Sequence, residues 1–187
     1  KIGIIGSIGS GKSYVAKNFG YPVFNADFEV SKIYKNNKNV FYKLNKILPK
    51  YIISFPIKKK EVTEAILSKK SNLKKIINII HKEVRKKMKL FLKKNKNKKI
   101  VILDVPLLLE NKLNSKKDIL VFVDAKTSII EKKLKNRPNF NRKLYNKFKK
   151  IQFSGLYKKR KSNFIIKNNF IKNNVKVEIQ NILKKIL

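Results

Sequence analysis

The chain has 187 residues, no cysteine and a formal net charge of +37, and 42% of its residues are hydrophobic. This length and apolar content suit one compact domain with one or two inserted subdomains, and they exclude a disordered tail. The lack of cysteine excludes disulfide bonds, thiolate zinc sites and a catalytic thiol. No apolar run is long enough to cross a bilayer and no signal-peptide pattern begins the sequence, so we expect a cytoplasmic protein with no membrane partner.

The positive charge comes mainly from lysine. Lysine occurs in nearly every segment, whereas arginine is limited to Arg85, Arg137, Arg142 and Arg160. Arginine is favoured for bidentate recognition of phosphates and bases, so this composition argues against a specific nucleic-acid partner. A polyanion partner stays the alternative. In either case the charge attracts anionic small molecules such as ATP.

A glycine-rich loop follows the first predicted strand. Residues 2–5 (IGII) predict a buried strand, residues 6–13 read GSIGSGKS, and residues 13–19 predict the next helix. A loop of this kind between a strand and a helix is typical of a P-loop. A chance match in a turn that contains glycine and lysine is the alternative interpretation.

The residue types of this loop suit a triphosphate. Glycine permits the positive φ angles that turn backbone N–H groups inward around a phosphate, and the loop has Gly6, Gly9 and Gly11. Lys12 can reach the β- and γ-phosphates, and the Ser13 hydroxyl can bind Mg²⁺. The loop therefore predicts ATP and Mg²⁺ as the cofactors of a phosphoryl transfer.

Four further apolar runs predict strands, at residues 21–24, 100–104, 119–124 and 163–167. Such continuous runs are typical of buried parallel strands. Helical periodicity covers residues 28–97, with a short separate helix at residues 61–67, and returns at residues 128–136, 142–153 and 175–187. The pattern predicts an α/β fold, a P-loop NTPase three-layer sandwich with a five-stranded parallel sheet, a helical substrate-binding insert and a helical lid.

We expect three regions in this fold. The nucleotide-binding core is predicted from residues 1–27, 98–132 and 161–187. The helical stretch at residues 28–97 is too long for a simple crossover and is predicted to be an inserted helical subdomain. The lysine-rich stretch at residues 133–160 has the composition of a lid.

Carboxylates at strand ends are the next candidates. Asp104 closes the IVILD strand and can hold Mg²⁺, although a helix cap or a loop acid is the alternative. Asp27 follows the second strand and can act as the general base, with an N-cap as its alternative. Glu110 in DVPLLLE can bind substrate or only cap its loop.

His81 is the only histidine and lies on a predicted helix, IINIIHKEV. Taken alone, such a histidine is more often a packed residue than a catalyst. Arg85 lies one helical turn later, so the two side chains share a face and can together meet an anionic substrate.

The order of these motifs resembles the dephospho-CoA kinase family over the whole chain. The succession is IGSGKS, VFNAD, IIHKEVR, LDVPLLLE, a Q-x6-KR segment and FIIKNN, and DVPLLLE is its most specific part. The resemblance implies transfer of the ATP γ-phosphoryl group to the ribose 3′-hydroxyl of dephospho-CoA, the last step of coenzyme A synthesis. It implies Asp27, Lys12 and Arg137 as the catalytic residues, with Asp27 as the base.

The resemblance also implies that the helical subdomain at residues 28–97 binds the substrate, and it implies the binding residues. Asn25 stands where the family usually has an acid, and Lys82 replaces the proline of the HP-x2-R helix. For dephospho-CoA the implied contacts are Asp27, His81, Arg85, Pro106, Leu107, Leu108 and Glu110. For ATP they are Gly6, Ile8, Gly9, Ser10, Gly11, Lys12, Ser13, Tyr14, Arg137, Arg160 and Asn168, with Asn168 near the adenine. For the metal they are Ser13 and Asp104.

Two other classes share part of this pattern. A nucleoside monophosphate or shikimate-type kinase would have the P-loop and the lid but would lack DVPLLLE. A basic nucleic-acid-binding ATPase or polynucleotide kinase is supported by the charge alone. We expect dephospho-CoA as the partner, no specific nucleic acid, and a monomer or weak homo-oligomer.

Overall fold

The computed structural model of the protein describes residues 1–138 and 140–187. Residue 139, which falls within the predicted lid, lies outside the described residues. The chain divides into two compact units. We call Lys1–Asn25 together with Asn97–Leu187 the core unit, and Ala26–Lys96 the helical unit.

The core unit contains a five-stranded parallel sheet with the strand order β2-β3-β1-β4-β5. The strands are β1 (Ile2–Gly6), β2 (Val23–Asn25), β3 (Ile102–Asp104), β4 (Ile119–Asp124) and β5 (Phe164–Lys167). All five residues of β1 are buried, because β1 is the central strand and both of its faces are covered. The predicted five-stranded parallel sheet is confirmed. All five carboxyl ends lie at one edge, where β2, β3 and β4 end in Asn25, Asp104 and Asp124.

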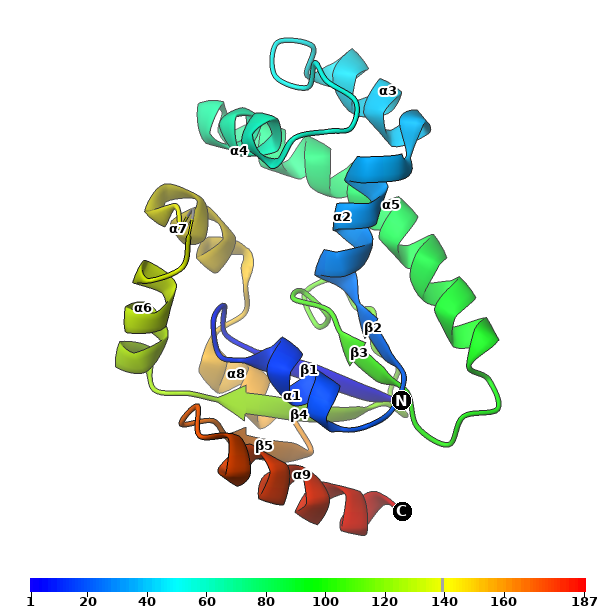
Figure 1. Ribbon diagram of the computed structural model, residues 1–187, viewed down its shortest axis with the longest axis vertical. Coiled ribbons are helices and arrows are strands. Elements are labelled where there is room, and N and C mark those ends of the chain that lie inside the picture. The colour runs from blue at the N-terminus through cyan, green and yellow to red at the C-terminus, as the bar shows by residue number, and fades with distance from the viewer. Residues whose placement is uncertain (139) are drawn as a thin grey trace. The chain divides into compact units, whose positions relative to one another are not determined.

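Helices cover both faces of this sheet. The helices of the core unit are α1 (Lys12–Asn18), α6 (Thr127–Lys135), α7 (Arg142–Ile151), α8 (Gly155–Arg160) and α9 (Lys172–Ile186), and α1, α8 and α9 pack on the strands. Figure 1 shows α1 in front of the sheet and α8 behind it. On the α1 side, the alternate residues Ile2 and Ile4 of β1 share a core with Val15 of α1 and with Val175 and Ile179 of α9. The α/β layering predicted from the sequence is therefore confirmed.

One predicted helix was wrong at its C-terminal end. The sequence pattern predicted a helix through residue 153, but α7 ends at Ile151 and a separate short helix, α8, begins at Gly155. Ser154 is the N-cap of α8, and its hydroxyl accepts a hydrogen bond from the Tyr157 N–H at 3.2 Å. A serine before a glycine reads as a break in a helix, whereas here it starts the next one.

The helical unit consists of α2 (Ala26–Asn36), α3 (Lys38–Ile47), α4 (Lys59–Ser68) and α5 (Lys70–Lys94). These helices match the helical periodicity of residues 28–97. Their apolar stripes bury side chains such as Ile33, Leu44, Ile66 and Ile80. Among the described residues, no helix has the length and apolar content needed to cross a membrane.

Candidate active site

The glycine-rich loop runs from the end of β1 to the first residue of α1. Gly9 has φ 83° and Gly11 has φ 91°, a region of backbone space that strongly favours glycine. The Ser10 N–H donates to the Ser7 carbonyl at 3.2 Å, and the Val15 N–H of α1 donates to the Gly11 carbonyl at 3.0 Å. The loop therefore turns directly into a helix N-terminus, where free N–H groups and the helix dipole favour an anion.

Side chains pack closely on the loop, so a larger residue at Gly9 or Gly11 would displace them. A Cβ on Gly9 would lie 3.0 Å from Ile130 Cγ2 on α6. A Cβ on Gly11 would lie 2.3 Å from Asn168 Nδ2, beyond the end of β5. The loop is thus enclosed between α6 and the segment that joins β5 to α9.

Asn168 holds the loop through its side-chain amide. Its Nδ2 donates to the Ser10 carbonyl at 2.8 Å, and its Oδ1 accepts from the Phe170 N–H at 2.8 Å. The Asn168 N–H donates to the Asp124 carbonyl at 2.7 Å, and the residue is 3% exposed. These hydrogen bonds of Asn168 could not be predicted from the sequence, because they join segments far apart in the chain. The predicted contact of Asn168 with ATP stays a prediction.

The side chain of Lys12 lies over the loop. Its ammonium donates to the Ser7 carbonyl at 2.7 Å and to the Gly6 carbonyl at 3.3 Å. The Gly6 and Ser7 carbonyls therefore hold the buried ammonium group of Lys12 at the P-loop. Ser13 and Tyr14, in the first turn of α1, are exposed.

Asp104 and Asn25 meet at the carboxyl edge of the sheet. They are register partners on β3 and β2, and Asn25 Nδ2 donates to Asp104 Oδ2 at 2.5 Å. Asp104 is 3% exposed. An ionised aspartate at position 25 would repel this carboxylate, whereas the Asn25 amide stabilises it. The Asn25 departure therefore supplies a hydrogen-bond donor to Asp104.

The DVPLLLE loop follows β3. Pro106 and Leu107 are half-buried, whereas Leu108 is buried. The Leu108 side chain packs against Gly3 of β1 so closely that a Cβ added to Gly3 would lie 2.5 Å from Leu108 Cδ2. Leu108 thus fixes the loop to the sheet. Its predicted contact with the acceptor stays a prediction.

Glu110, at the end of this loop, lies in a buried ion pair. Its Oε1 is 2.8 Å from Lys158 Nζ of α8 and accepts a hydrogen bond from the Phe153 N–H at 2.9 Å. The sequence did not single out Lys158, because the run Lys158-Lys159-Arg160 offers three similar cations and only the fold selects one. The predicted contact of Glu110 with substrate stays a prediction.

The two predicted lid arginines are exposed. Arg137 follows α6, and Arg160 is the last residue of α8. Beside Arg160, Lys159 forms an exposed ion pair with Asp124 at 3.1 Å. The predicted positions of both arginines over the ATP phosphates stay predictions.

Asp27 lies in the first turn of α2, two residues after β2 ends. Its side chain is exposed, and a helix N-terminus favours a negatively charged carboxylate. Its alternative role as an N-cap does not hold, because α2 begins one residue earlier, at Ala26. The predicted role of Asp27 as the general base stays a prediction.

His81 and Arg85 lie one turn apart on α5. Burial, and then the positive charge of Arg85, lower the pKa of His81 below its usual value of 6.5. His81 is therefore neutral near pH 7, and Arg85 carries the positive charge of this face.

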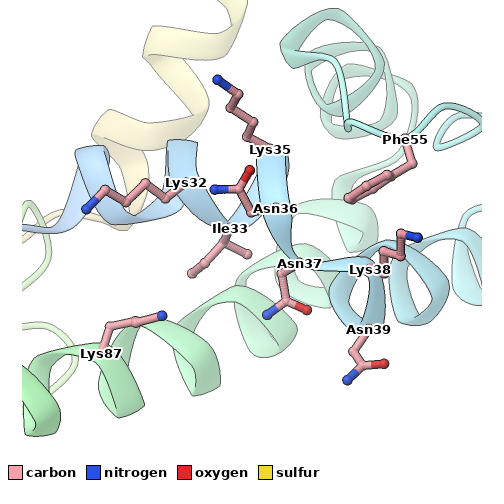
Figure 2. Close-up of a pocket in the computed structure, with 9 residues that line it drawn as sticks. All are labelled: Lys32, Ile33, Lys35, Asn36, Asn37, Lys38, Asn39, Phe55 and Lys87. Carbon is pink, nitrogen blue, oxygen red and sulfur yellow. The ribbon is translucent and has the colours of Figure 1, made fainter.

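The helical unit also has a hollow of about 680 Å³ between α2, α3 and α5. Lys32, Lys35, Lys38, Lys87 and Phe55 are part of its lining, and Figure 2 shows Lys87 reaching from α5 toward α2. The four lysines are exposed. Because lysine occurs throughout the chain, we assign no site to this basic lining.

Comparison with known proteins decides the family. The family model described as dephospho-CoA kinase matches residues 1–173. The chain belongs to the dephospho-CoA kinase family. A relative named dephospho-CoA kinase from the Wolbachia of Brugia malayi is 31% identical, over 97% of this chain and 95% of its own. The resemblance drawn from the motif order is therefore confirmed.

Solved structures show the same fold. A protein of Thermus thermophilus has a TM-score of 0.76 and 22% identity, over 100% of this chain and 97% of its own. The dephospho-CoA kinase of Campylobacter jejuni has a TM-score of 0.65 and 20% identity, over 99% of this chain and 96% of its own. These two likenesses support the P-loop kinase fold.

Proposed function

We propose that this chain phosphorylates the ribose 3′-hydroxyl of dephospho-CoA with ATP and releases coenzyme A and ADP. The observation that carries the proposal is the match of the dephospho-CoA kinase family to residues 1–173. The P-loop and the DVPLLLE loop both lie within the matched residues. The reaction is the last step of coenzyme A biosynthesis.

The P-loop is the proposed donor site. Backbone N–H groups of residues 9–13 would surround the β-phosphate, and Lys12 would move from the Gly6 and Ser7 carbonyls to the γ-phosphate. Arg137 and Arg160 would neutralise the charge that develops on the transferred group. Contacts with the nucleotide are also proposed for Gly6, Ile8, Gly9, Ser10, Gly11, Tyr14 and Asn168.

Ser13 and Asp104 fit a magnesium ion. Mg²⁺ prefers oxygen ligands and is usually held by one or two protein groups together with phosphate oxygens. The Ser13 hydroxyl is exposed beside the loop, and the buried Asp104 carboxylate is oriented by Asn25. When bound, Mg²⁺ would neutralise charge on the β- and γ-phosphates.

Asp27 is the proposed general base. Its carboxylate would accept the proton of the 3′-hydroxyl as that oxygen attacks the γ-phosphorus. Arg85 would bind an anionic part of dephospho-CoA, and the neutral His81 would donate a hydrogen bond. Pro106, Leu107, Leu108 and Glu110 complete the proposed acceptor contacts.

The three predicted regions are retained as proposals. Residues 28–97 would bind dephospho-CoA, residues 133–160 would form the lid, and the remaining residues would bind ATP. Lid closure would exclude water, which otherwise consumes ATP. We also propose a cytoplasmic monomer or weak homo-oligomer without a specific nucleic-acid partner.

An assay of ADP release tests the proposal. Dephospho-CoA, AMP, shikimate and an oligonucleotide are offered separately with ATP and Mg²⁺. We expect turnover with dephospho-CoA that exceeds turnover with each of the others by at least about a hundredfold, since the rival acceptors cannot use the same positioning contacts. Faster turnover with any other acceptor would refute the assignment.

A further inference from the structure

A buried ion pair joins α8 to the loop after β3. Lys158 Nζ lies 2.8 Å from Glu110 Oε1, and the two side chains are only 2% and 8% exposed. The adjacent pair on the same helix, Lys159 with Asp124, is 45% and 38% exposed. Solvent screens the exposed pair, whereas the buried pair strongly favours one arrangement of the two segments.

Two hydrogen bonds join the same segments. The Phe153 N–H donates to Glu110 Oε1 at 2.9 Å, and Gln152 Nε2 donates to the Pro106 carbonyl at 3.2 Å. Gln152 is the residue directly after α7. The C-terminal end of α7 is therefore fastened to the DVPLLLE loop.

Helix α7, which precedes the fastened residues Gln152 and Phe153, is packed loosely. None of the residues of α7 is buried. An element with few buried contacts moves at low energetic cost, whereas its fastened end does not. Gly155, at the start of α8, lies beside the P-loop: a Cβ added to it would be 3.8 Å from Ser7 Oγ. The fastened segment thus lies between a loosely packed helix and the loop.

Glu110 depends on these partners for its own stability. Its second oxygen, Oε2, is buried and has no hydrogen-bond partner among the described residues. Lys158 and the Phe153 N–H are therefore the groups seen to stabilise this carboxylate. Removal of Lys158 would leave a buried, unpaired charge and would release the segment.

We propose that Glu110 and Lys158 are positioning residues that fix the hinge about which α7 closes over the nucleotide. This inference rests on the proposed kinase function and names a role for a lysine that the sequence did not distinguish. With the hinge fixed, α7 closes in one position and excludes water from the γ-phosphate. With the hinge loose, closure is incomplete and water competes with the acceptor.

The competing step is ATP hydrolysis. The oxygen of water forms a bond to the γ-phosphorus, the bond from that phosphorus to the bridging oxygen breaks, ADP leaves, and the water proton passes to solvent. The ratio of phosphoryl transfer to hydrolysis therefore measures how well the closed α7 excludes water.

The experiment compares four variants of the full chain with the wild type. They are Glu110→Gln, Lys158→Met, the double variant, and Lys161→Met, which removes an exposed charge next to the C-terminal end of α8 as a control. Coenzyme A formation and phosphate release are measured together, with the KM values for ATP and dephospho-CoA and the Tm.

We expect each single variant to lower the ratio of transfer to hydrolysis by about tenfold, because small misplacement of a closing element is costly. Each should also lower Tm, while the double variant should regain most of the Tm because neither charge is then buried unpaired. Its ratio should nevertheless stay low. Lys161→Met should behave as the wild type.

Three outcomes would overturn the inference. First, the ratio of transfer to hydrolysis could be unchanged in folded single variants. Second, this ratio could return to the wild-type value in the double variant together with Tm, which would show a purely structural role. Glu110→Gln could instead raise only the KM for dephospho-CoA and leave the ratio unchanged, which would show that Glu110 contacts the acceptor without fixing a hinge. Where a single variant does not fold, the double variant decides. Failure of the proposed function is distinct, because the wild type itself would then form no coenzyme A.

Discussion

The P-loop of the core unit and the predicted acceptor residues of the helical unit are held in different ways. The P-loop is a backbone structure whose shape depends on α6 and on the buried Asn168 amide. The predicted acceptor residues Asp27 and Arg85 are exposed side chains on regular helices. Donor binding should therefore be sensitive to packing around the loop, whereas acceptor chemistry should depend on individual functional groups.

The largest effect is expected from removal of the Lys12 ammonium group at the P-loop. We expect Lys12→Ala to lower turnover by at least about a thousandfold, because this ammonium would stabilise charge on the β- and γ-phosphates. Lys17→Ala, on the exposed face of the same helix, is the matched control and should retain activity. Full activity of Lys12→Ala in a steady-state assay would exclude the P-loop as the donor site.

A smaller effect is expected at the acceptor side. Asp27→Asn should lower kcat by at least about a hundredfold with little change in ATP affinity, as expected for the loss of a general base. Glu29→Gln, in the same helical turn, should have little effect, because Glu29 pairs with the exposed Lys32. An unchanged kcat for Asp27→Asn would remove Asp27 from this role.

Asn168 tests whether packing shapes donor binding. Asn168→Asp replaces the donor that faces the Ser10 carbonyl with an oxygen, so we expect the KM for ATP to rise about tenfold, equivalent to about 1.4 kcal/mol. Asn169→Asp is the control, since an aspartate keeps the acceptor that the Ile171 N–H needs. Equal KM values for the two variants would show that these hydrogen bonds of Asn168 do not shape the ATP site.

The smallest effect concerns His81 and pH. Burial and Arg85 lower its pKa in the folded state, so the unfolded chain binds a proton more readily as the pH falls below 6.5. The free energy of unfolding should therefore decrease in this range, and His81→Gln should remove that part of the decrease. Urea unfolding of both proteins above and below this pH measures the difference. Identical pH dependence would contradict the account.

The sequence predicted the elements and the order of the motifs well, because buried parallel strands and amphipathic helices leave clear periodic patterns. It could not predict contacts that join distant segments. Lys158 is one of three consecutive cations, and only the position of Glu110 determines which of them is buried. Asn163 shows the same limit. Its Oδ1 accepts a hydrogen bond from the Leu120 N–H at 2.8 Å, although 43 positions separate the two residues in the chain.

The central claim is phosphorylation of the ribose 3′-hydroxyl of dephospho-CoA. The most direct measurement is identification of the product formed by the wild-type chain from dephospho-CoA, ATP and Mg²⁺, by mass spectrometry and phosphorus NMR. The account predicts dephospho-CoA that has gained one phosphoryl group at the ribose 3′-oxygen, with one ADP released for each. Unchanged dephospho-CoA, or a phosphoryl group at another position, would contradict it.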